Sequence, residues 1–391
     1  MSTMTELLAP AGTLEKLKFA LAYGADAVYL AGEHFGLRAQ AGNFALSEVE
    51  EGVLLAHRKK KKLYVVVNSY LFDEEYPQLE EYVANLRDIG PDALIVSDIG
   101  VLETVKRIAP NMELHISTQA NTTSLRAAQA WQRLGATRIV LARELDLAKI
   151  RTIAKAVETE VFVHGAMCMA YSGRCILSAY LTGRSANRGD CTHTCRWRFH
   201  LTEETREGQY MPVEEDERGT YILSPGDLCL LDSLQELVEA GVASLKIEGR
   251  MKSVHYVAVT TLAYRLALDA LQNGLPIPKK SFELVESVSH RPFTTGFLYG
   301  KPPESSQSYL STRDFVAVVE EDHIAVRTAI KTGETLEILT PEGKQHLITW
   351  PVMRKNGEEV YEAHPNWQVQ ADLPPIPKMS LIRRVIGGAS S

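Results

Sequence analysis

The segment from Lys62 to Asp98, KLYVVVNSYLFDEEYPQLEEYVANLRDIGPDALIVSD, decides the fold. It begins with a short apolar run rich in β-branched residues, continues through an amphipathic stretch from Tyr76 to Ile89, and ends with a second apolar run. Short β-branched runs are typical of strands buried on both faces, and helical spacing of apolar residues between them predicts a helix. The segment therefore predicts one strand–helix–strand unit with parallel strands.

The same alternation extends outward over most of the chain. Helix-period segments at 13–23, 125–134 and 147–157 separate further apolar runs. Eight such units within about 250 residues favour a closed (β/α)₈ barrel of the TIM type, and an open doubly wound sheet is the alternative that the pattern leaves open. The eight candidate strands read ELLAP, DAVYLAG, KLYVVVNS, DALIVSD, ELHISTQ, RIVLAR, EVFVHG and SLKIEG.

The chain changes character after the barrel. We expect the α/β barrel over residues 1–275, with a cysteine-rich insertion at about 165–230, and a proline-rich polar linker over 276–312. Short alternating strands then predict a small all-β barrel domain over 313–391. Its phrase IKTGETLEIL resembles the second-domain barrel of translation factors, which suits docking on RNA. A structural lid or an oligomerisation module is an equal alternative.

Composition limits the functional classes. The chain has 391 residues, a net charge of −7 and five cysteines. The acidic balance argues against a strongly basic, sequence-indifferent nucleic-acid binder. No secretory signal or membrane span is recognisable, so we expect a cytoplasmic protein without a membrane partner, whose cysteines are reduced thiols.

Polar residues follow the apolar runs, where packing does not require them. In a barrel these positions meet at the carboxyl ends of the strands and predict a polar pocket. His164, Glu248 and Asp98 are the candidate catalytic groups, His164 because an imidazole titrates near neutrality. Each has a structural alternative, because Asp98 can cap a helix, Glu248 can pair with Arg250 or Lys246, and a buried histidine is usually structural. The further candidates, for substrate binding, are Asn68, Gln119, Arg143 and Arg250.

The cysteines are clustered. Cys168, Cys175, Cys191 and Cys195 follow the seventh expected strand closely, and Cys229 comes after an expected hairpin. Structural zinc sites usually show two close cysteine pairs, and only Cys191 and Cys195 resemble one. The irregular spacings favour an iron–sulfur cluster held by thiolates from separate loops. Zinc, and buried or redox-active thiols, remain as alternatives.

One motif carries a family resemblance. The pattern Glu160-x-Phe162-x₂-Gly165-Ala166-Met167-Cys168-x₄-Gly173-x-Cys175-x-Leu177-Ser178 resembles the signature of the collagenase-like peptidase family U32 at every position. The likeness continues through Cys195–Trp197 and Ser244–Ser253 into the β domain. Within the family, the chain resembles the members that form 5-hydroxyuridine at the wobble position of bacterial tRNA.

The resemblance implies more than the residue patterns do. It implies a tRNA-modifying hydroxylase that works without oxygen, is linked to prephenate as co-substrate, and receives a 4Fe-4S cluster from the iron–sulfur assembly machinery. The ligands would be Cys168, Cys175, Cys191 and Cys229, with Cys195 as the alternative to Cys191. We expect Arg143 and Arg250 to bind the two carboxylates of prephenate by charge-assisted hydrogen bonds.

Other functions compete with this one. A U32-type peptidase is disfavoured because the sequence has neither an H-E-x-x-H zinc motif nor a G-x-S-x-G elbow. A quinone-precursor hydroxylase of the same family and a non-catalytic RNA-binding or cluster-scaffold protein are further alternatives. The β domain favours RNA, as does the segment CRWRFH, in which Arg196 and Trp197 are expected to contact phosphate and stack on a base.

Overall fold

The computed structural model describes residues 5–37, 43–168, 170–197, 215–216, 219–220, 226–300 and 309–386. The chain forms two compact units. The first comprises Met1–Leu21, Ala25–Lys252 and Arg291–Tyr309, and the second comprises Ala22–Gly24, Ser253–His290 and Leu310–Ser391. In the part of the chain that the structure describes, no helix is both long and apolar enough to cross a membrane.

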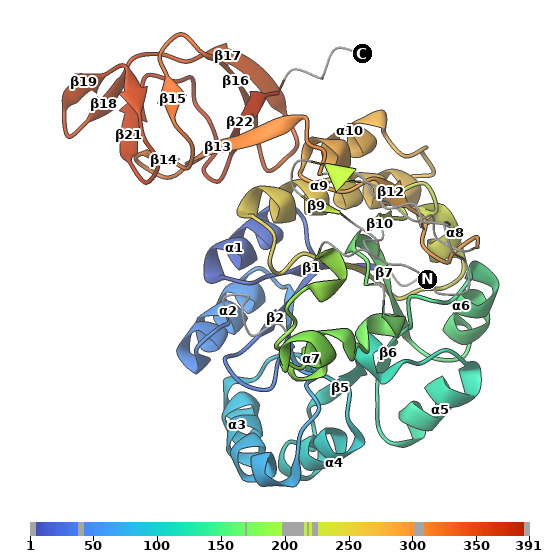
Figure 1. The fold of residues 1–391 in the computed structure, drawn as a ribbon. Coiled ribbons are helices and arrows are strands. Elements are labelled where there is room, and N and C mark those ends of the chain that lie inside the picture. The colour runs from blue at the N-terminus through green and yellow to red at the C-terminus, as the bar shows by residue number, and fades with distance from the viewer. Residues whose placement is uncertain are drawn as a thin grey trace, which may run out of the picture. The chain divides into compact units, whose positions relative to one another are not determined.

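The first unit is a closed parallel barrel (Figure 1). Each strand pairs in parallel with the next, and β11 pairs with both β1 and β7, which closes the sheet. All eight expected strands are confirmed, and the closure excludes the open sheet. The barrel strands are β1 (Glu6–Pro10), β2 (Ala27–Ala31), β3 (Lys62–Val67), β4 (Ala93–Val96), β5 (Glu113–Ile116), β6 (Arg138–Val140), β7 (Thr159–Ala166) and β11 (Ser244–Ile247).

Helices surround the strands as an outer ring (Figure 1). Their apolar faces are buried, as α3 shows with Leu79, Val83 and Leu86, and side chains such as Ser124 and Asp146 cap their first turns. The ring consists of α1 (Leu14–Ala22), α2 (Leu46–Arg58), α3 (Tyr76–Ile89), α4 (Ile99–Ile108), α5 (Leu125–Arg133), α6 (Leu147–Ala154) and α8 (Leu234–Glu239), with 3₁₀ turns η1 (Asp73–Glu75) and η2 (Thr118–Ala120).

The expected insertion leaves the barrel at β7. Strand β7 runs on past its barrel partners and pairs antiparallel with β10 (Asp227–Cys229), which in turn pairs with β12 (Phe293–Thr294). Between β7 and β10 lie η3 (Tyr171–Gly173), α7 (Leu177–Thr182), η4 (Ala186–Arg188), η5 (Thr194–Arg196) and the two-residue pair β8 (Glu215–Asp216) and β9 (Gly219–Thr220).

The second unit contains two helices and an antiparallel sheet. Helices α9 (Val254–Gln272) and α10 (Lys279–Ser287) precede the sheet, so the segment 276–312 holds a helix where we expected an irregular linker. Leu284 and Val285 are buried, which explains why α10 forms despite its polar surroundings. A buried core around Trp350, Met353 and Ile382 holds the sheet. The strands form a curved half-barrel and a separate pair, β15 (Ile330–Lys331) with β20 (Glu362–Ala363). The half-barrel order is β17 (Gln345–Thr349), β16 (Thr335–Leu339), β22 (Leu381–Val385), β13 (Arg313–Val319), β14 (Ile324–Val326), β21 (Gln368–Ala371), β18 (Met353–Lys355) and β19 (Glu358–Val360).

Candidate active site at the barrel mouth

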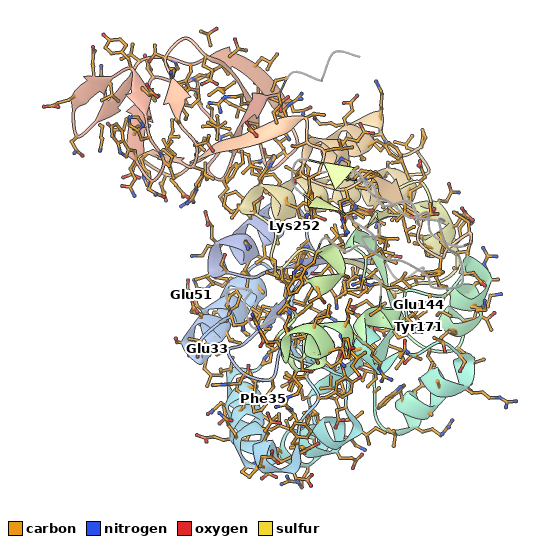
Figure 2. The ribbon with its side chains drawn as sticks, viewed as in Figure 1. Glu33, Phe35, Glu51, Glu144, Tyr171 and Lys252 are labelled. Carbon is orange, nitrogen blue, oxygen red and sulfur yellow. The ribbon has the colours of Figure 1, made fainter. Side chains whose placement is uncertain are left out.

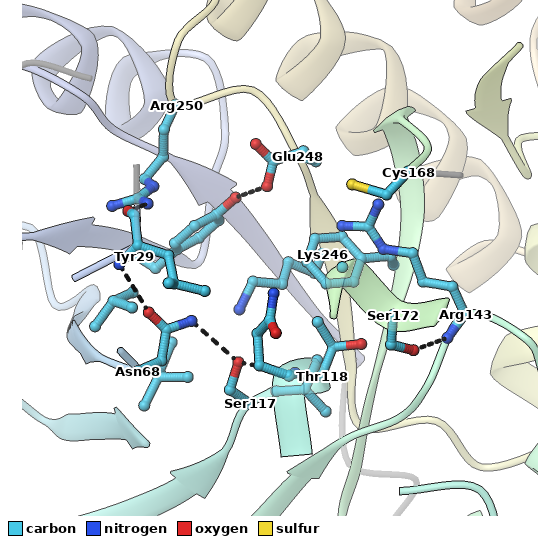
Figure 3. Close-up of a pocket in the computed structure, with 17 residues that line it drawn as sticks. Tyr29, Asn68, Ser117, Thr118, Arg143, Cys168, Ser172, Lys246, Glu248 and Arg250 are labelled. Carbon is cyan, nitrogen blue, oxygen red and sulfur yellow. Dashed lines mark hydrogen bonds between the residues drawn. The ribbon is translucent and has the colours of Figure 1, made fainter. Parts of the chain in front are cut away.

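A polar cavity of about 90 Å³ opens at the carboxyl ends of the barrel strands (Figure 3). Its lining residues come from seven of the eight barrel strands, β2 to β7 and β11, or from the segments that follow these strands, so one face of the barrel collects them. Five of the residues expected in a polar pocket line it: Asn68, Gln119, Arg143, Glu248 and Arg250. The structure adds Tyr29, Ser117, Thr118, Ser172 and Lys246.

Glu248 lies on the cavity wall and is almost fully buried. The Tyr29 hydroxyl donates to Glu248 Oε2 at 3.2 Å and to the Ile247 carbonyl oxygen at 3.0 Å (Figure 3). The Glu248 carboxylate is thus held beside the cavity by a phenol, in reach of a bound molecule.

Asn68 and Gln119 also line the cavity. Asn68 accepts from the Leu37 amide at 3.1 Å and donates from Nδ2 to Ser117 Oγ at 3.2 Å (Figure 3). Gln119 Oε1 is buried and has no hydrogen-bond partner among the described residues. A bound ligand with a donor group would satisfy this oxygen, because a buried polar atom without a partner is costly.

Both predicted arginines line the cavity, and both are partly engaged. The Arg143 guanidinium donates from NH1 to the Ala166 carbonyl oxygen at 2.9 Å and lies 4.0 Å from the centroid of the Phe162 ring. Arg250 donates from NH2 to the Leu37 carbonyl oxygen. Arg143 is therefore not paired with its neighbour Glu144, the structural alternative for this residue, since Glu144 instead accepts from the amide and hydroxyl of Ser172.

His164 does not line the cavity. Strand β7 carries a β-bulge opposite the step from Lys246 to Ile247, and beyond it His164 pairs with Ile247 instead of continuing the inward series of Glu160 and Phe162. The imidazole is buried and lies 5.6 Å from the ring of Phe293, centroid to centroid. The catalytic role of His164 stays a prediction, without support from its position.

Asp98 also lies outside the lining residues. Its carboxylate accepts from the amides of Gly100 at 2.8 Å and Val101 at 3.2 Å, so it caps α4. The Tyr76 hydroxyl donates to the same oxygen at 3.2 Å. This is the structural alternative that the sequence left open for Asp98, and its catalytic role stays a prediction.

A second pocket of about 390 Å³ adjoins the polar cavity. Four thiols line it: Cys168, Cys175, Cys191 and Cys195. Leu37, Gln119, Cys168 and Gly173 line both spaces, so the cysteine pocket and the polar cavity share a wall. A group bound among the cysteines would therefore face a molecule held in the barrel mouth.

Hydrogen bonds fix the walls of the cysteine pocket. The Cys175 amide donates to Asn187 Oδ1 at 3.0 Å, and Ser178, fully buried, contacts Thr192 with 2.9 Å between the hydroxyl oxygens. Glu144 holds Ser172, whose φ of 45° lies in the left-handed region. Figure 2 labels Glu144 and Tyr171, the residue before Ser172. The loops that carry the thiols are thus tied to each other and to β6.

The donor set fits an iron–sulfur cluster. Thiolates are the usual cluster ligands, and each binds its own iron, so cluster cysteines surround a space instead of converging on one point. Among the residues with described positions, no three Cys, His, Asp or Glu side chains are placed to share a single metal ion. Cys229 lies on β10 opposite His164 and does not line the pocket, whereas Cys195 does. Both ligand sets stay predictions.

The expected RNA contacts fall partly within the described chain. Trp197 is about half exposed, and the backbone of Arg196 belongs to η5, but its side chain lies outside the described residues. Two further apolar side chains of this segment are exposed. Ile176 lines the cysteine pocket and is 80% exposed, and Tyr180 lies on α7 and is 83% exposed. Apolar exposure of this kind marks binding surfaces.

The chain is similar in sequence to several named bacterial proteins. A Bacillus subtilis (strain 168) protein named tRNA hydroxylation protein P1 is 41% identical over 354 residues, covering 86% of this chain and 84% of its own. An Escherichia coli (strain K12) protein named tRNA hydroxylation protein P is 37% identical over 410 residues, covering 90% of each chain. The Escherichia coli protein named 23S rRNA 5-hydroxycytidine C2501 synthase is 36% identical over 395 residues, covering 94% of this chain and 57% of its own.

One solved structure and two family models also match this chain. A solved structure titled as the U32 peptidase Mk0906 covers 64% of this chain and 95% of its own, at 15% identity and a TM-score of 0.43. The model of peptidase family U32 matches residues 12–308, and that of the peptidase family U32 C-terminal domain matches residues 311–383. The chain therefore belongs to peptidase family U32.

Proposed function

We propose that this protein is a tRNA hydroxylase that forms 5-hydroxyuridine at the wobble position, with prephenate as co-substrate, no requirement for oxygen and a 4Fe-4S cluster as cofactor. Sequence similarity to two relatives supports tRNA hydroxylation as the reaction. Both are named tRNA hydroxylation proteins; one is 41% identical over 86% of this chain, and the other is 37% identical over 90% of it. A further relative is named as an rRNA hydroxycytidine synthase, so pyrimidine hydroxylation in RNA recurs among the relatives.

The arrangement of the two pockets supports the cofactor. Cys168, Cys175 and Cys191 line one space and would hold the cluster, with Cys229 as the fourth ligand implied by the family resemblance. When bound, the cluster would supply electron transfer or Lewis-acid chemistry next to the polar cavity. The two glycines of the family signature allow the cysteine segment to pack closely against the cavity residues. A β-carbon on Gly173 would lie 2.6 Å from Gln119 Nε2, and a β-carbon on Gly165 would lie 2.4 Å from the Glu248 carbonyl oxygen.

The side chains of the cavity supply binding and proton transfer. Arg143 and Arg250 bind the carboxylates of the co-substrate, and Asn68 and Gln119 orient it through hydrogen bonds. Glu248 is the carboxylate on the cavity wall, so it accepts or donates the proton that moves when the pyrimidine is hydroxylated. Tyr29, which donates to Glu248, keeps this carboxylate turned toward the cavity.

The exposed rim supports RNA as substrate. Ile176 lines the cysteine pocket, and Tyr180 and Trp197 are exposed aromatic side chains on the segments that carry Cys175 and Cys195. Recognition of single-stranded RNA relies on stacking of unpaired bases against such side chains, and anticodon loops present unpaired bases. Enzymes that modify a base take it out of the stack into a pocket. Because the net charge of the chain is −7, base stacking and shape contribute more to tRNA affinity than a general attraction to phosphate does.

The test is nucleoside mass spectrometry of tRNA from a strain that lacks the gene, grown with and without oxygen. We expect wobble 5-hydroxyuridine to disappear and to return when the wild-type gene is supplied, but not when Cys168→Ser is supplied. Unchanged 5-hydroxyuridine in the deletion strain would refute the substrate. A colourless protein that contains zinc but no iron after anaerobic purification would refute the cofactor.

A further inference from the structure

A buried lysine forms the floor of the polar cavity. Lys246 is the third residue of β11, is 4% exposed, and lines the cavity. Its ammonium group donates to Glu160 Oε1 at 2.6 Å and lies 4.3 Å from the ring centroid of Tyr29 and 5.4 Å from that of Phe162. Figure 3 shows Lys246 between the walls that carry Tyr29 and Arg143. The motifs of the sequence assign this lysine no role.

Lys246 ends a chain of alternating charges inside the barrel. Glu6 accepts from Arg138 NH1 at 2.6 Å, the same nitrogen lies 3.5 Å from Glu160 Oε2, and Glu160 contacts Lys246 through its other oxygen. The four residues come from β1, β6, β7 and β11, so the chain of charges crosses the barrel interior. Burial by itself raises the pKa of Glu160, but the charges of Lys246 and Arg138 outweigh burial and lower this pKa.

Stability alone is a poor reason for such a chain. Well-packed apolar residues usually stabilise an interior as well as buried ion pairs do, because desolvating charges is costly. Glu160 divides its two oxygens between Arg138 and Lys246, and no other described side chain accepts a hydrogen bond from the Lys246 ammonium. An ammonium group has three donors, so two are left for the cavity and its aromatic walls.

We propose that the cavity floor is a binding subsite for a carboxylate, in which the Lys246 ammonium is the anchoring cation. The identity of the ligand rests on the proposed function, which supplies a dicarboxylate co-substrate. Arg143, whose Nε is buried without a partner among the described residues, provides a second cationic group on the wall. Gln119 Oε1 accepts a donor group of the same molecule.

The size of the cavity selects this class of ligand. A space of about 90 Å³ takes a small anionic group, and the neighbouring space of about 390 Å³ takes the bulkier part of a molecule. The phosphate of an RNA backbone cannot reach the floor, because its two flanking riboses would have to enter with it. The subsite therefore anchors one end of a small molecule and directs its other end toward Cys168 and Gly173, which line both spaces.

The test separates binding from the structural role of the ion pair. Lys246→Met alone leaves the buried Glu160 with only its longer contact to Arg138, and we expect it to lower the unfolding temperature. The double variant Lys246→Met with Glu160→Gln removes both charges of the pair and is expected to regain most of the thermal stability. Calorimetric titration of the anaerobically purified holoprotein with prephenate, malonate and the neutral dimethyl malonate then measures the subsite.

We expect wild type to bind a carboxylate probe and not the diester, and the double variant to bind that probe about 10- to 100-fold more weakly, as expected for a lost hydrogen bond between charged groups. Lys61→Met is the matched control. The Lys61 ammonium also pairs with a carboxylate, Asp26, at 2.8 Å, but neither residue lines the cavity. The Lys61→Met variant should therefore bind the carboxylate probe as tightly as wild type does. Equal affinity in the double variant and wild type, or no binding of either carboxylate to wild type, overturns the subsite. Lys246-dependent binding of malonate without binding of prephenate keeps the subsite and refutes the proposed co-substrate.

Discussion

Gly165 lies so close to Glu248 that a β-carbon at position 165 would fall 2.4 Å from the Glu248 carbonyl oxygen and 2.9 Å from its β-carbon. Gly165 also has a φ of +109°, a conformation that L side chains rarely adopt. The Glu248 amide donates to the carbonyl oxygen of His164 at 2.8 Å, so the ends of β7 and β11 are held together at this point. This contact places the cavity carboxylate beside the strand that leads to Cys168.

Gly165→Ala is therefore expected to damage the site as well as stability. Gly90→Ala is the matched control, since Gly90 has a φ of +77° but no atom within 4 Å of its would-be β-carbon. We expect the control to lose about 1–2 kcal/mol of unfolding free energy from the left-handed backbone alone. Gly165→Ala should lose more and should abolish tRNA modification. Urea unfolding and nucleoside mass spectrometry measure both, and equal losses in the two variants would contradict the steric argument.

Serine replacements identify the cluster ligands. Cys168→Ser, Cys175→Ser, Cys191→Ser and Cys229→Ser are each expected to lose iron and sulfide after anaerobic purification, because a serine hydroxyl is a poor ligand for iron–sulfur clusters. Cys195→Ser should keep both. Loss of iron in Cys195→Ser together with retained iron in Cys191→Ser would give the position of Cys191 to Cys195, and the same loss with retained iron in Cys229→Ser would give it the position of Cys229, which does not line the pocket.

The two carboxylates of the strand ends should respond differently to amide replacement. Asn caps a helix as well as Asp does, so Asp98→Asn should keep both stability and modification. Glu248→Gln should lower the modification rate by about 10²- to 10⁴-fold, the usual contribution of a general acid or base. Single-turnover assays on tRNA measure the rates. A large loss in Asp98→Asn would restore the catalytic role that the sequence suggested for it.

The aromatic rim should contribute to RNA affinity. Tyr180→Ala is expected to weaken tRNA binding by about 1–3 kcal/mol, the range for one base stacked on an aromatic side chain. Tyr299→Ala is the control, because Tyr299 is also exposed in the first unit but its hydroxyl contacts Glu236 on α8, and it does not belong to the insertion that carries the cysteines. Fluorescence anisotropy with an anticodon stem-loop measures both affinities. Equal affinities of the two variants would remove Tyr180 from the RNA-binding surface.

His255 should make the second unit sensitive to acid. Burial, aided by the nearby charge of Arg383, lowers the pKa of His255 from 6.5 to about 3, and the imidazole stacks on Phe315 at 5.5 Å. Between these two pKa values the unfolded chain binds a proton that the folded chain does not, so stability falls as pH drops from about 6.5 toward about 3. His255→Phe should reduce the slope of unfolding free energy by up to about 1.4 kcal/mol per pH unit in that window. An unchanged slope, measured by urea unfolding at several pH values, would contradict this account.

The strands of the barrel could be predicted from sequence because each is a short apolar run followed by a helix-period segment. Helix α10 was not predicted, because its four buried residues, Ser281, Leu284, Val285 and Ser287, lie among prolines and charged side chains that favour a linker. The eventual place of His164 could not be predicted either. A bulge at Val163 changes the inward series of β7, and the apolar residues on either side of it do not fix its position.

Two charged residues within apolar runs, Lys246 and Glu160, are a sequence signal for the polar interior of the barrel. A lysine inside the apolar run SLKI, and a glutamate at the start of EVFV, contradict strands buried on both faces unless the two charges meet. Their spacing on parallel neighbours, Ser244 opposite Glu160 and Lys246 opposite Phe162, permits that contact. Such paired violations of the apolar pattern are a readable signal for a polar barrel interior. The cysteine pocket gives no such signal, because its walls depend on turns such as the left-handed Ser172.

The antiparallel pairing of Asp227 with Ala166 also has an evolutionary and practical consequence. The cysteine-bearing insertion departs from β7 and returns on β10, so its two ends are held side by side by backbone hydrogen bonds. A loop whose ends are already joined can change in length at little entropic cost to the rest of the fold. The segment between residues 166 and 227 can therefore differ in length among family members without disturbing the closure of the barrel, which rests on the pairing of β11 with β1 and β7.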